Sequence, residues 1–185
     1  MKRTALAALA LALTAPLTAH AGARTLPAPP VEAQVDAVIA KTAAAYAAAP
    51  NKLAAGAATH ARAHDMCELM VPLKGTVQNW AGVVTKLDST ASGAGILAVM
   101  FASGAVAETE SMDMGPIGDH TLLTPGSAVF NAATKLSVGE AVTFSGHFFP
   151  SAATCFKEMS LTTSDMMHKA HYEFMFTAVA PLPKH

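Results

Sequence analysis

Three side chains that can ligate a metal ion share one face of a predicted helix. His60, His64 and Cys67 stand at positions i, i+4 and i+7, and helical residues at these spacings lie on the same side. The His-x-x-x-His spacing is found in metal sites on helices. The competing interpretation is a packing face, with a buried Cys67 and two histidines at its edges. Leu53 and Ala57 fall on the same face, which favours that alternative.

A second group of candidate ligands combines methionine and histidine from two segments. Thioether and imidazole groups hold Cu(I) in oxidising compartments, where free thiolates are lost to disulfides. The spacing matches no specific motif, and methionine is also a common filler of hydrophobic cores. The alternative to a copper site is therefore a set of core and surface methionines. The candidate ligands are Met112, Met114 and His120 in the first segment, and Met166, Met167, His168 and His171 in the second.

Motifs of the common enzyme classes are absent from the sequence. It contains no Gly-rich phosphate loop, no nucleophile elbow and no His-Glu-x-x-His. Ser145 precedes a glycine, but it falls within a predicted strand and not at a strand-to-helix turn. Glu108 and Glu110 lie two residues apart on a strand and share one face, which a solvated strand surface explains. The sequence therefore predicts a non-catalytic protein without a cofactor, with copper as the alternative.

The first residues have the pattern of a cleavable export signal. Lys2 and Arg3 precede the Ala- and Leu-rich run Ala5–Leu13, which is too short to cross a bilayer as a helix. Small residues at the required spacing allow a cut after Ala21 or Ala23. An uncut membrane anchor is the alternative, and the short run disfavours it. We expect a mature periplasmic protein with no further transmembrane segment.

The sequence contains two cysteines, Cys67 and Cys155. An exported protein with two cysteines most often oxidises them together, so a disulfide between them is predicted. The competing interpretations are two separate buried thiols, or Cys67 acting as a ligand beside His60 and His64.

The expected mature chain is acidic. Of the 12 Lys and Arg in the full sequence, Lys2 and Arg3 leave with the signal, so ten remain against 13 Asp and Glu. Between Thr76 and Ala180, four Lys face nine acids. Because an acidic domain lacks the basic surface that binds phosphate backbones, no nucleic-acid partner is expected.

Four segments with different patterns follow one another along the chain. Residues 1–21 are the expected signal, and residues 22–30 form a Pro-rich linker. Residues 31–72 form an Ala-rich helical arm of two stretches interrupted by a proline, the second running over Lys52–Met70. Residues 73–181 have strand-like patterns and form the folded domain.

The strand pattern of the last segment predicts a small barrel. A short helix over Ser127–Leu136 separates three early strands from the later ones, which is the arrangement of an OB-fold. The predicted fold class is α+β: an OB-like small β-barrel with an N-terminal Ala-rich helical arm. The expected strands are Val77–Leu87, Ile96–Ala102, Ala105–Met112, Ala141–Phe149, Ser160–Thr163 and Glu173–Val179.

Four sequence elements resemble a family of small exported bacterial proteins of unassigned function. They are Trp-x-Gly-x-Val at 80–84, Phe-Ser-Gly-x-Phe at 144–148, a Cys before Ser-Leu-Thr at 155–162, and Glu-Phe-x-Phe at 173–176. The resemblance covers roughly Asn51 to Val179, and it departs from the family pattern at Ser111–Asp119 and at Asp165–His171. It implies the barrel and adds no chemistry.

Together these features predict an exported, non-catalytic binding or structural protein of the periplasm. Its partner would be a periplasmic protein, a peptide or a small ligand. The alternative function is soft-metal binding, with copper held by Met and His.

Overall fold

The computed structural model describes residues 28–110 and 120–183. The expected signal peptide with its cleavage sites, most of the linker, and the candidate ligands Met112 and Met114 lie outside these residues.

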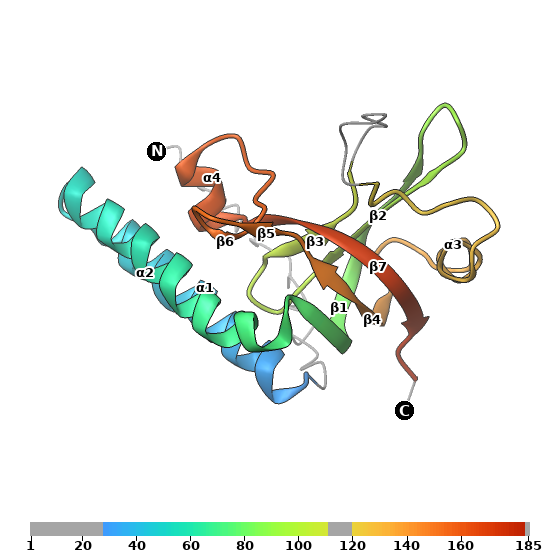
Figure 1. Ribbon diagram of the computed structural model, residues 1–185, viewed down its shortest axis with the longest axis horizontal. Coiled ribbons are helices and arrows are strands. Elements are labelled where there is room, and N and C mark those ends of the chain that lie inside the picture. The colour runs from blue at the N-terminus through green and yellow to red at the C-terminus, as the bar shows by residue number, and fades with distance from the viewer. Residues whose placement is uncertain (1–27, 111–119, 184–185) are drawn as a thin grey trace, which may run out of the picture.

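Five strands close into a barrel, with one short helix between the third and fourth of them along the chain (Figure 1). They are β1 (Thr76–Ser89), β2 (Gly95–Met100), β3 (Val106–Glu108), β4 (Ala141–Phe148) and β7 (His171–Pro181), and the helix is α3 (Ala128–Ala133). The order around the barrel is β1-β2-β3-β7-β4, antiparallel throughout except for the parallel pair β3 and β7. The predicted OB-like α+β fold is confirmed.

The remaining elements lie outside the barrel. They are α1 (Pro30–Ala47), α2 (Lys52–Met70), the short 3-10 helix η1 (Val71–Leu73), β5 (Pro150–Ser151), β6 (Cys155–Phe156) and α4 (Thr163–His168). Strands β5 and β6 pair with each other as a separate two-stranded hairpin.

Aromatic rings fill the barrel. Every second residue of β4 is buried, including Phe144 and Phe148. The ring centroids of both lie close to that of Phe174, at 5.5 and 4.7 Å. Trp80 of β1 joins this cluster edge-on to Phe101, at 5.6 Å. The interior is thus a packed core, stabilised by the burial of large apolar surfaces.

Gly146 lies where two strands approach each other closely. The register between β4 and β7 shifts between Ser145 and Gly146. A Cβ atom at Gly146 would overlap the carbonyl oxygen of Met175 and the ring of Phe174. This lack of space explains the glycine of the Phe-Ser-Gly-x-Phe element.

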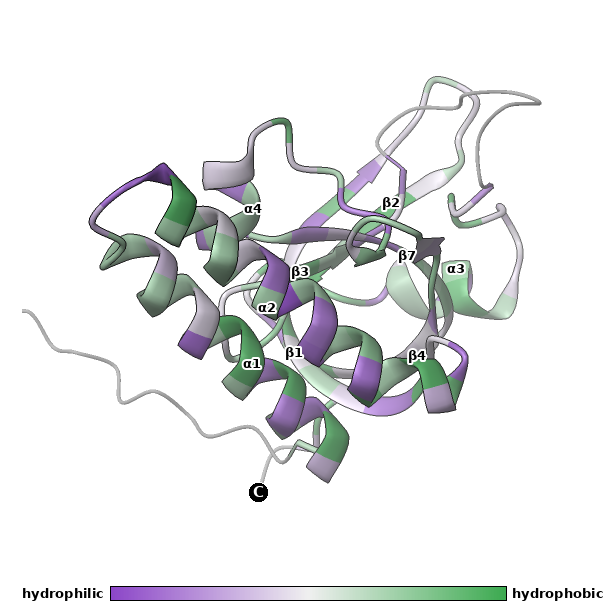
Figure 2. Ribbon diagram, turned by 60° about the vertical axis from the view of Figure 1, so that its left-hand side comes forward, coloured by the Kyte–Doolittle hydropathy of each residue, from purple (hydrophilic) through white to green (hydrophobic). Residues whose placement is uncertain are grey.

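The helical arm consists of α1 and α2 lying side by side across one side of the barrel (Figure 1 and Figure 2). Helix α2 begins after Asn51, whose side-chain oxygen accepts a hydrogen bond from the N–H of Ala54 at 3.0 Å. The arm residues that join the barrel core are Val35, Ile39, Met66 and Met70. Among the described residues, no helix has both the length and the apolar character that crossing a membrane requires.

Two sequence expectations about the barrel segment are wrong. The strand expected at Ser160–Thr163 is instead a loop with a bend at Leu161 and Thr162, and Thr163 begins α4. The Thr162 side chain caps that helix by accepting from the N–H of Asp165. The expected solvated face at Glu108 and Glu110 is in fact buried. The Glu108 carboxylate lies 3.0 Å from Lys86 Nζ and 3.1 Å from His171 Nδ1, and such partners offset the cost of burying a charge.

Candidate functional site

Cys67 and Cys155 form a disulfide, as the sequence predicts. Their Cα atoms lie 5.3 Å apart although 88 residues separate them in the chain. Cys67 lies in the last turn of α2, and Cys155 begins β6. The bond therefore fastens the arm to the β5–β6 hairpin, which forms a two-stranded sheet separate from the barrel.

The helix face of His60, His64 and Cys67 is exposed except at Cys67, which is half-buried and packs against the core. Of the expected packing face, therefore, only the position of Cys67 packs. Leu53 on this face is 86% exposed, and both histidines are exposed. Because the sulfur of Cys67 is bonded to Cys155, it carries no thiolate that could ligate a metal beside the histidines. The packing face of α2 is instead formed by Ala58, Arg62, Met66 and Met70, at every fourth position.

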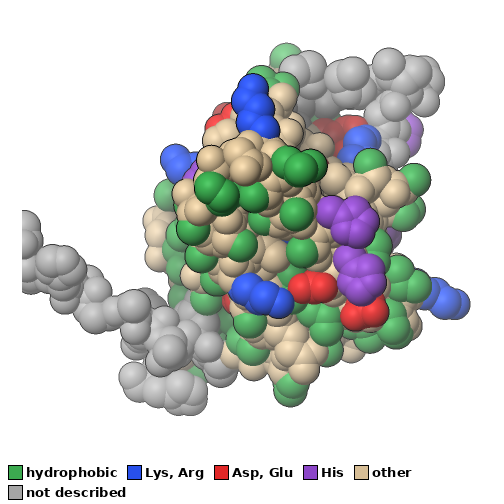
Figure 3. All heavy atoms as spheres, turned by 90° about the vertical axis from the view of Figure 1, so that its left-hand side faces the viewer, with side chains coloured by type: hydrophobic (Ala, Val, Ile, Leu, Met, Phe, Trp, Pro, Cys, Tyr) green, Lys and Arg blue, Asp and Glu red, His purple; other side chains and the backbone are tan. Residues whose placement is uncertain are grey.

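The exposed histidines of α2 lie in a polar part of the surface. His64 Nδ1 is 3.4 Å from an oxygen of Asp65, and His64 Nε2 is 3.7 Å from an oxygen of Glu68. Figure 3 shows histidine and acidic side chains next to one another on the face of the molecule seen from the side of the arm. Contacts of this kind between exposed polar side chains contribute little to stability.

The described members of the Met and His group point to different partners. Met167 is 1% exposed and packs in the interior, whereas Met166 is half-buried. His168 Nδ1 lies 2.8 Å from the carbonyl oxygen of Ser164, and His171 Nδ1 lies beside Glu108. His120 is exposed in a loop. Within residues 28–110 and 120–183, no three or more His, Cys, Asp or Glu side chains are grouped to hold a metal ion.

Arg62 is a buried cation that sequence reasoning does not single out. It is 4% exposed, and its guanidinium makes four hydrogen bonds. The acceptors are Thr42 Oγ1 and the carbonyl oxygen of Ile39 in α1, and the carbonyl oxygens of Met166 and Met167 in α4. Burial lowers the pKa of Arg62 from its ordinary value. Arg62 thus holds both helices of the arm to α4, and its only sequence signal is its place in the four-residue repeat of α2.

Glu32 is a buried carboxyl group between the arm and the barrel. The backbone N–H of Ala81 in β1 donates to both of its oxygens, at 3.0 and 2.8 Å. Burial raises the pKa of Glu32 from 4.5 to about 8, against the lowering effect of that hydrogen bond and with a further rise from Asp36. At neutral pH the neutral acid is therefore the favoured form in the folded protein.

We expect the protein to lose stability as the pH rises from 4.5 to about 8, the window between the unfolded and folded pKa values of Glu32. The folded state binds more protons there, so the free energy of unfolding falls by at most about 1.4 kcal/mol per pH unit. Urea unfolding at several pH values measures this slope. Glu32→Gln should reduce the slope to the part contributed by Glu158, whereas the exposed control Glu68→Gln should keep it. An unchanged slope in Glu32→Gln would contradict the prediction.

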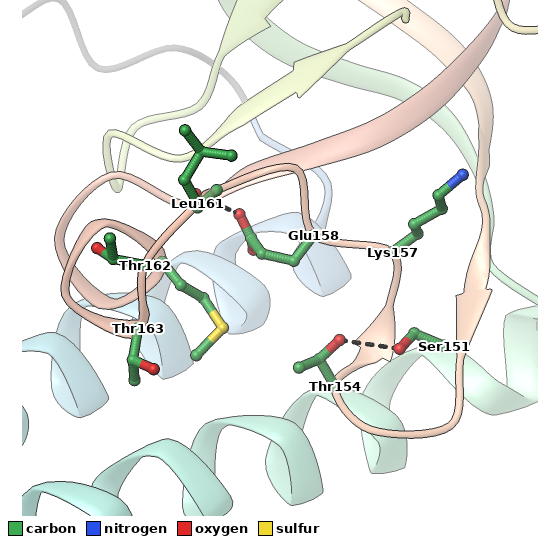
Figure 4. A pocket seen from close by; sticks show the side chains of 9 residues that line it. Ser151, Thr154, Lys157, Glu158, Leu161, Thr162 and Thr163 are labelled. Atoms are coloured by element: carbon green, nitrogen blue, oxygen red, sulfur yellow. Dashed lines mark hydrogen bonds between the residues drawn. The ribbon is translucent and has the colours of Figure 1, made fainter. Parts of the chain in front are cut away.

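A pocket of about 350 Å³ lies beside the β5–β6 hairpin (Figure 4). One wall comes from the hairpin, and the other from the bend and the first turns of α4. A pocket of this size accommodates a small molecule. Its lining is polar, because five of the nine residues carry hydroxyl groups. The lining residues are Ser151, Thr154, Lys157, Glu158, Ser160, Leu161, Thr162, Thr163 and Met166.

Glu158 is the acidic member of the lining. The Ser160 hydroxyl and the backbone N–H of His171 both donate to its Oε1, each at 2.7 Å. Its Oε2 is buried and has no hydrogen-bond partner in the part of the chain that the structure describes. Burial raises the pKa of Glu158, against the lowering effect of these hydrogen bonds and of nearby His171.

A narrow inner gap continues behind Glu158. It is lined by Glu158, Arg62 and Tyr172 among others, and its volume of about 10 Å³ is close to that of one water molecule. Burial raises the pKa of Tyr172, so its hydroxyl stays protonated at neutral pH.

Comparison with protein-family models, with curated proteins and with solved structures finds no match for this chain.

Proposed function

We propose that this chain is an exported, non-catalytic binding protein of the periplasm, and that the pocket beside the β5–β6 hairpin is its binding site. Two features support export: the signal-like first residues and the Cys67–Cys155 disulfide, a bond typical of oxidising compartments. They are independent of each other, since one lies in the first residues and the other within the fold.

The pocket is the observation that carries the binding role. The barrel interior is occupied by aromatic rings, so the recess lies outside it, between the hairpin and α4. Two interactions between residues far apart in the chain hold the walls of the pocket in place. The disulfide fixes the hairpin to α2, and Arg62 fixes the carbonyl end of α4 to the same helix. A recess whose walls are fixed in this way is suited to hold a ligand with little loss of entropy on binding.

Export is tested by expressing the full chain and fractionating the cells. We expect a periplasmic protein that begins at Gly22 or Arg24, with a mass lowered by the two hydrogens of one disulfide. A matched chain that starts at Gly22 should stay in the cytoplasm and keep both thiols. Recovery of the uncut chain, still carrying Lys2 and Arg3, from the membrane fraction would contradict the proposal.

Binding is tested by native mass spectrometry of the protein purified from the periplasm. We expect a bound small molecule that is released on denaturation, and the same spectra report copper, the alternative ligand. Thr163→Trp should fill the pocket and abolish the bound mass, because Thr163 is an exposed lining residue. Thr124→Trp places the same ring on an exposed threonine outside the lining and should leave the bound mass unchanged. Equal retention by both variants would place the binding elsewhere.

A further inference from the structure

We propose that the pocket takes an organic cation, a ligand whose protonated amino group is bound by the Glu158 carboxylate. This inference rests on the proposed binding function and names the class of ligand.

Lys157 and Glu158 both line the pocket, and the backbone between them directs their charged ends to different sides. The segment from Lys157 to Met159 runs extended and antiparallel to the start of β7. The N–H of Glu173 donates to the carbonyl oxygen of Lys157, and the N–H of Met159 donates to the carbonyl oxygen of His171. Successive side chains of an extended segment point to opposite sides. Lys157 Nζ accordingly lies 2.8 Å from Glu173 Oε2, and Figure 4 shows its amino group directed away from Glu158.

Arg62, the second cation near Glu158, donates none of its hydrogen bonds to the Glu158 carboxyl group. Arg62 lines the inner gap with Glu158, but its hydrogen bonds go to one hydroxyl and three carbonyl oxygens. Burial raises the pKa of Glu158, and a cationic ligand bound at this carboxyl group favours its ionised form. Glu158 is thus a carboxylate with one oxygen hydrogen-bonded and the other, Oε2, without a partner within residues 28–110 and 120–183.

The rest of the lining supplies acceptors suited to an ammonium group. An ammonium donates three hydrogen bonds and accepts none. Ser151 and Thr154 lie on the hairpin wall and Thr163 on the opposite wall, and hydroxyl oxygens can accept. Met166 adds an apolar side chain against which a short carbon chain can pack.

The charge of the whole domain favours the same ligand class. Between Thr76 and Ala180, four Lys face nine acids, so the net negative charge of this segment gives a long-range potential that attracts cations and repels anions. An anionic ligand would meet both this potential and the Glu158 carboxylate.

The probe for the test is putrescine, with butanediol and succinate as neutral and anionic ligands of the same chain length. Isothermal titration of the purified mature protein should show saturable binding of putrescine only. Glu158→Gln keeps an acceptor for Ser160 and His171 but removes the charge, and should weaken binding at least about tenfold, the effect of losing one hydrogen bond to a charged group. Glu68→Gln removes the same charge from an exposed site on α2 and should leave binding unchanged.

A capped Ala-Lys-Ala peptide separates the two sources of an amino group. Tighter binding of putrescine identifies the ligand as a free amine, and tighter binding of the peptide identifies it as a lysine side chain of a partner. Both outcomes support the proposal. Butanediol or succinate binding as tightly as putrescine would overturn the cation assignment and leave the binding function standing. Failure of both amine probes, or unchanged binding by Glu158→Gln, would also overturn it, whereas the bound mass and the Thr163→Trp comparison test the binding function separately.

Discussion

Reducing the disulfide between Cys67 and Cys155 is expected to lower the free energy of unfolding by about 4–5 kcal/mol. The bond closes a loop across 88 residues, and the chain-entropy model gives this magnitude for a loop of that length. Urea unfolding with and without a reductant measures the difference. The double variant Cys67→Ser, Cys155→Ser should be equally destabilised and insensitive to the reductant.

The loss should not be uniform across the molecule. The arm is Ala-rich and contributes four side chains, Val35, Ile39, Met66 and Met70, to the shared core, so its attachment depends strongly on the bond. Hydrogen exchange of the reduced protein should therefore show α1 and α2 losing protection before β4 and β7. Simultaneous loss of protection in all four elements, or an unchanged unfolding midpoint, would contradict this view of the disulfide as a fastening for the arm.

Replacing Arg62 by Ala is expected to cost about 3–5 kcal/mol of stability, because charge-assisted hydrogen bonds are lost and buried carbonyl groups are left unpaired. The affected acceptors are the Thr42 hydroxyl and the carbonyl oxygens of Ile39, Met166 and Met167. Urea unfolding gives the magnitude, and hydrogen exchange in α4 reports whether that helix detaches.

Two further variants keep the Arg62 prediction testable if Arg62→Ala does not fold. Arg62→Lys retains the charge but cannot reach acceptors in two directions as a planar guanidinium does, so we expect a smaller loss. Lys52→Ala removes an exposed cation at the start of α2 and should change stability by less than about 0.5 kcal/mol. If Arg62→Lys and Lys52→Ala change the free energy of unfolding by equal, small amounts, Arg62 does not hold the arm to α4.

The barrel and the arm could be predicted from the sequence because local periodicity determines them. Alternation of apolar residues over 141–149 places Phe144 and Phe148 on one face of β4, as observed. Helix α2 starts and ends where the sequence indicates, because Asn51 caps it and Pro72 follows it. The disulfide followed from two cysteines together with an expected oxidising compartment.

Of the two failed expectations about the barrel segment, one depended on contacts between distant residues and the other partly on a local side-chain cap. The pair Glu108 and Glu110 has the alternation of a solvated strand face, but burial of Glu108 depends on Lys86 and His171, from β1 and β7. Ser160–Thr163 has local β-propensity, and the bend there is set by the side-chain cap of α4 and the pairing of Glu158 with Tyr172.

By itself, the sequence determined the OB-like barrel, the helical arm and the cysteine pair, since periodicity and composition act over short distances. Only the tertiary structure decided which polar groups are buried and what they contact. Arg62 bonds to the carbonyl oxygens of Met166 and Met167, more than one hundred residues away, and no pattern within α2 specifies those acceptors. The same holds for Glu158, because the Oε2 without a partner and the pocket around it exist only once the hairpin, α4 and β7 have packed together.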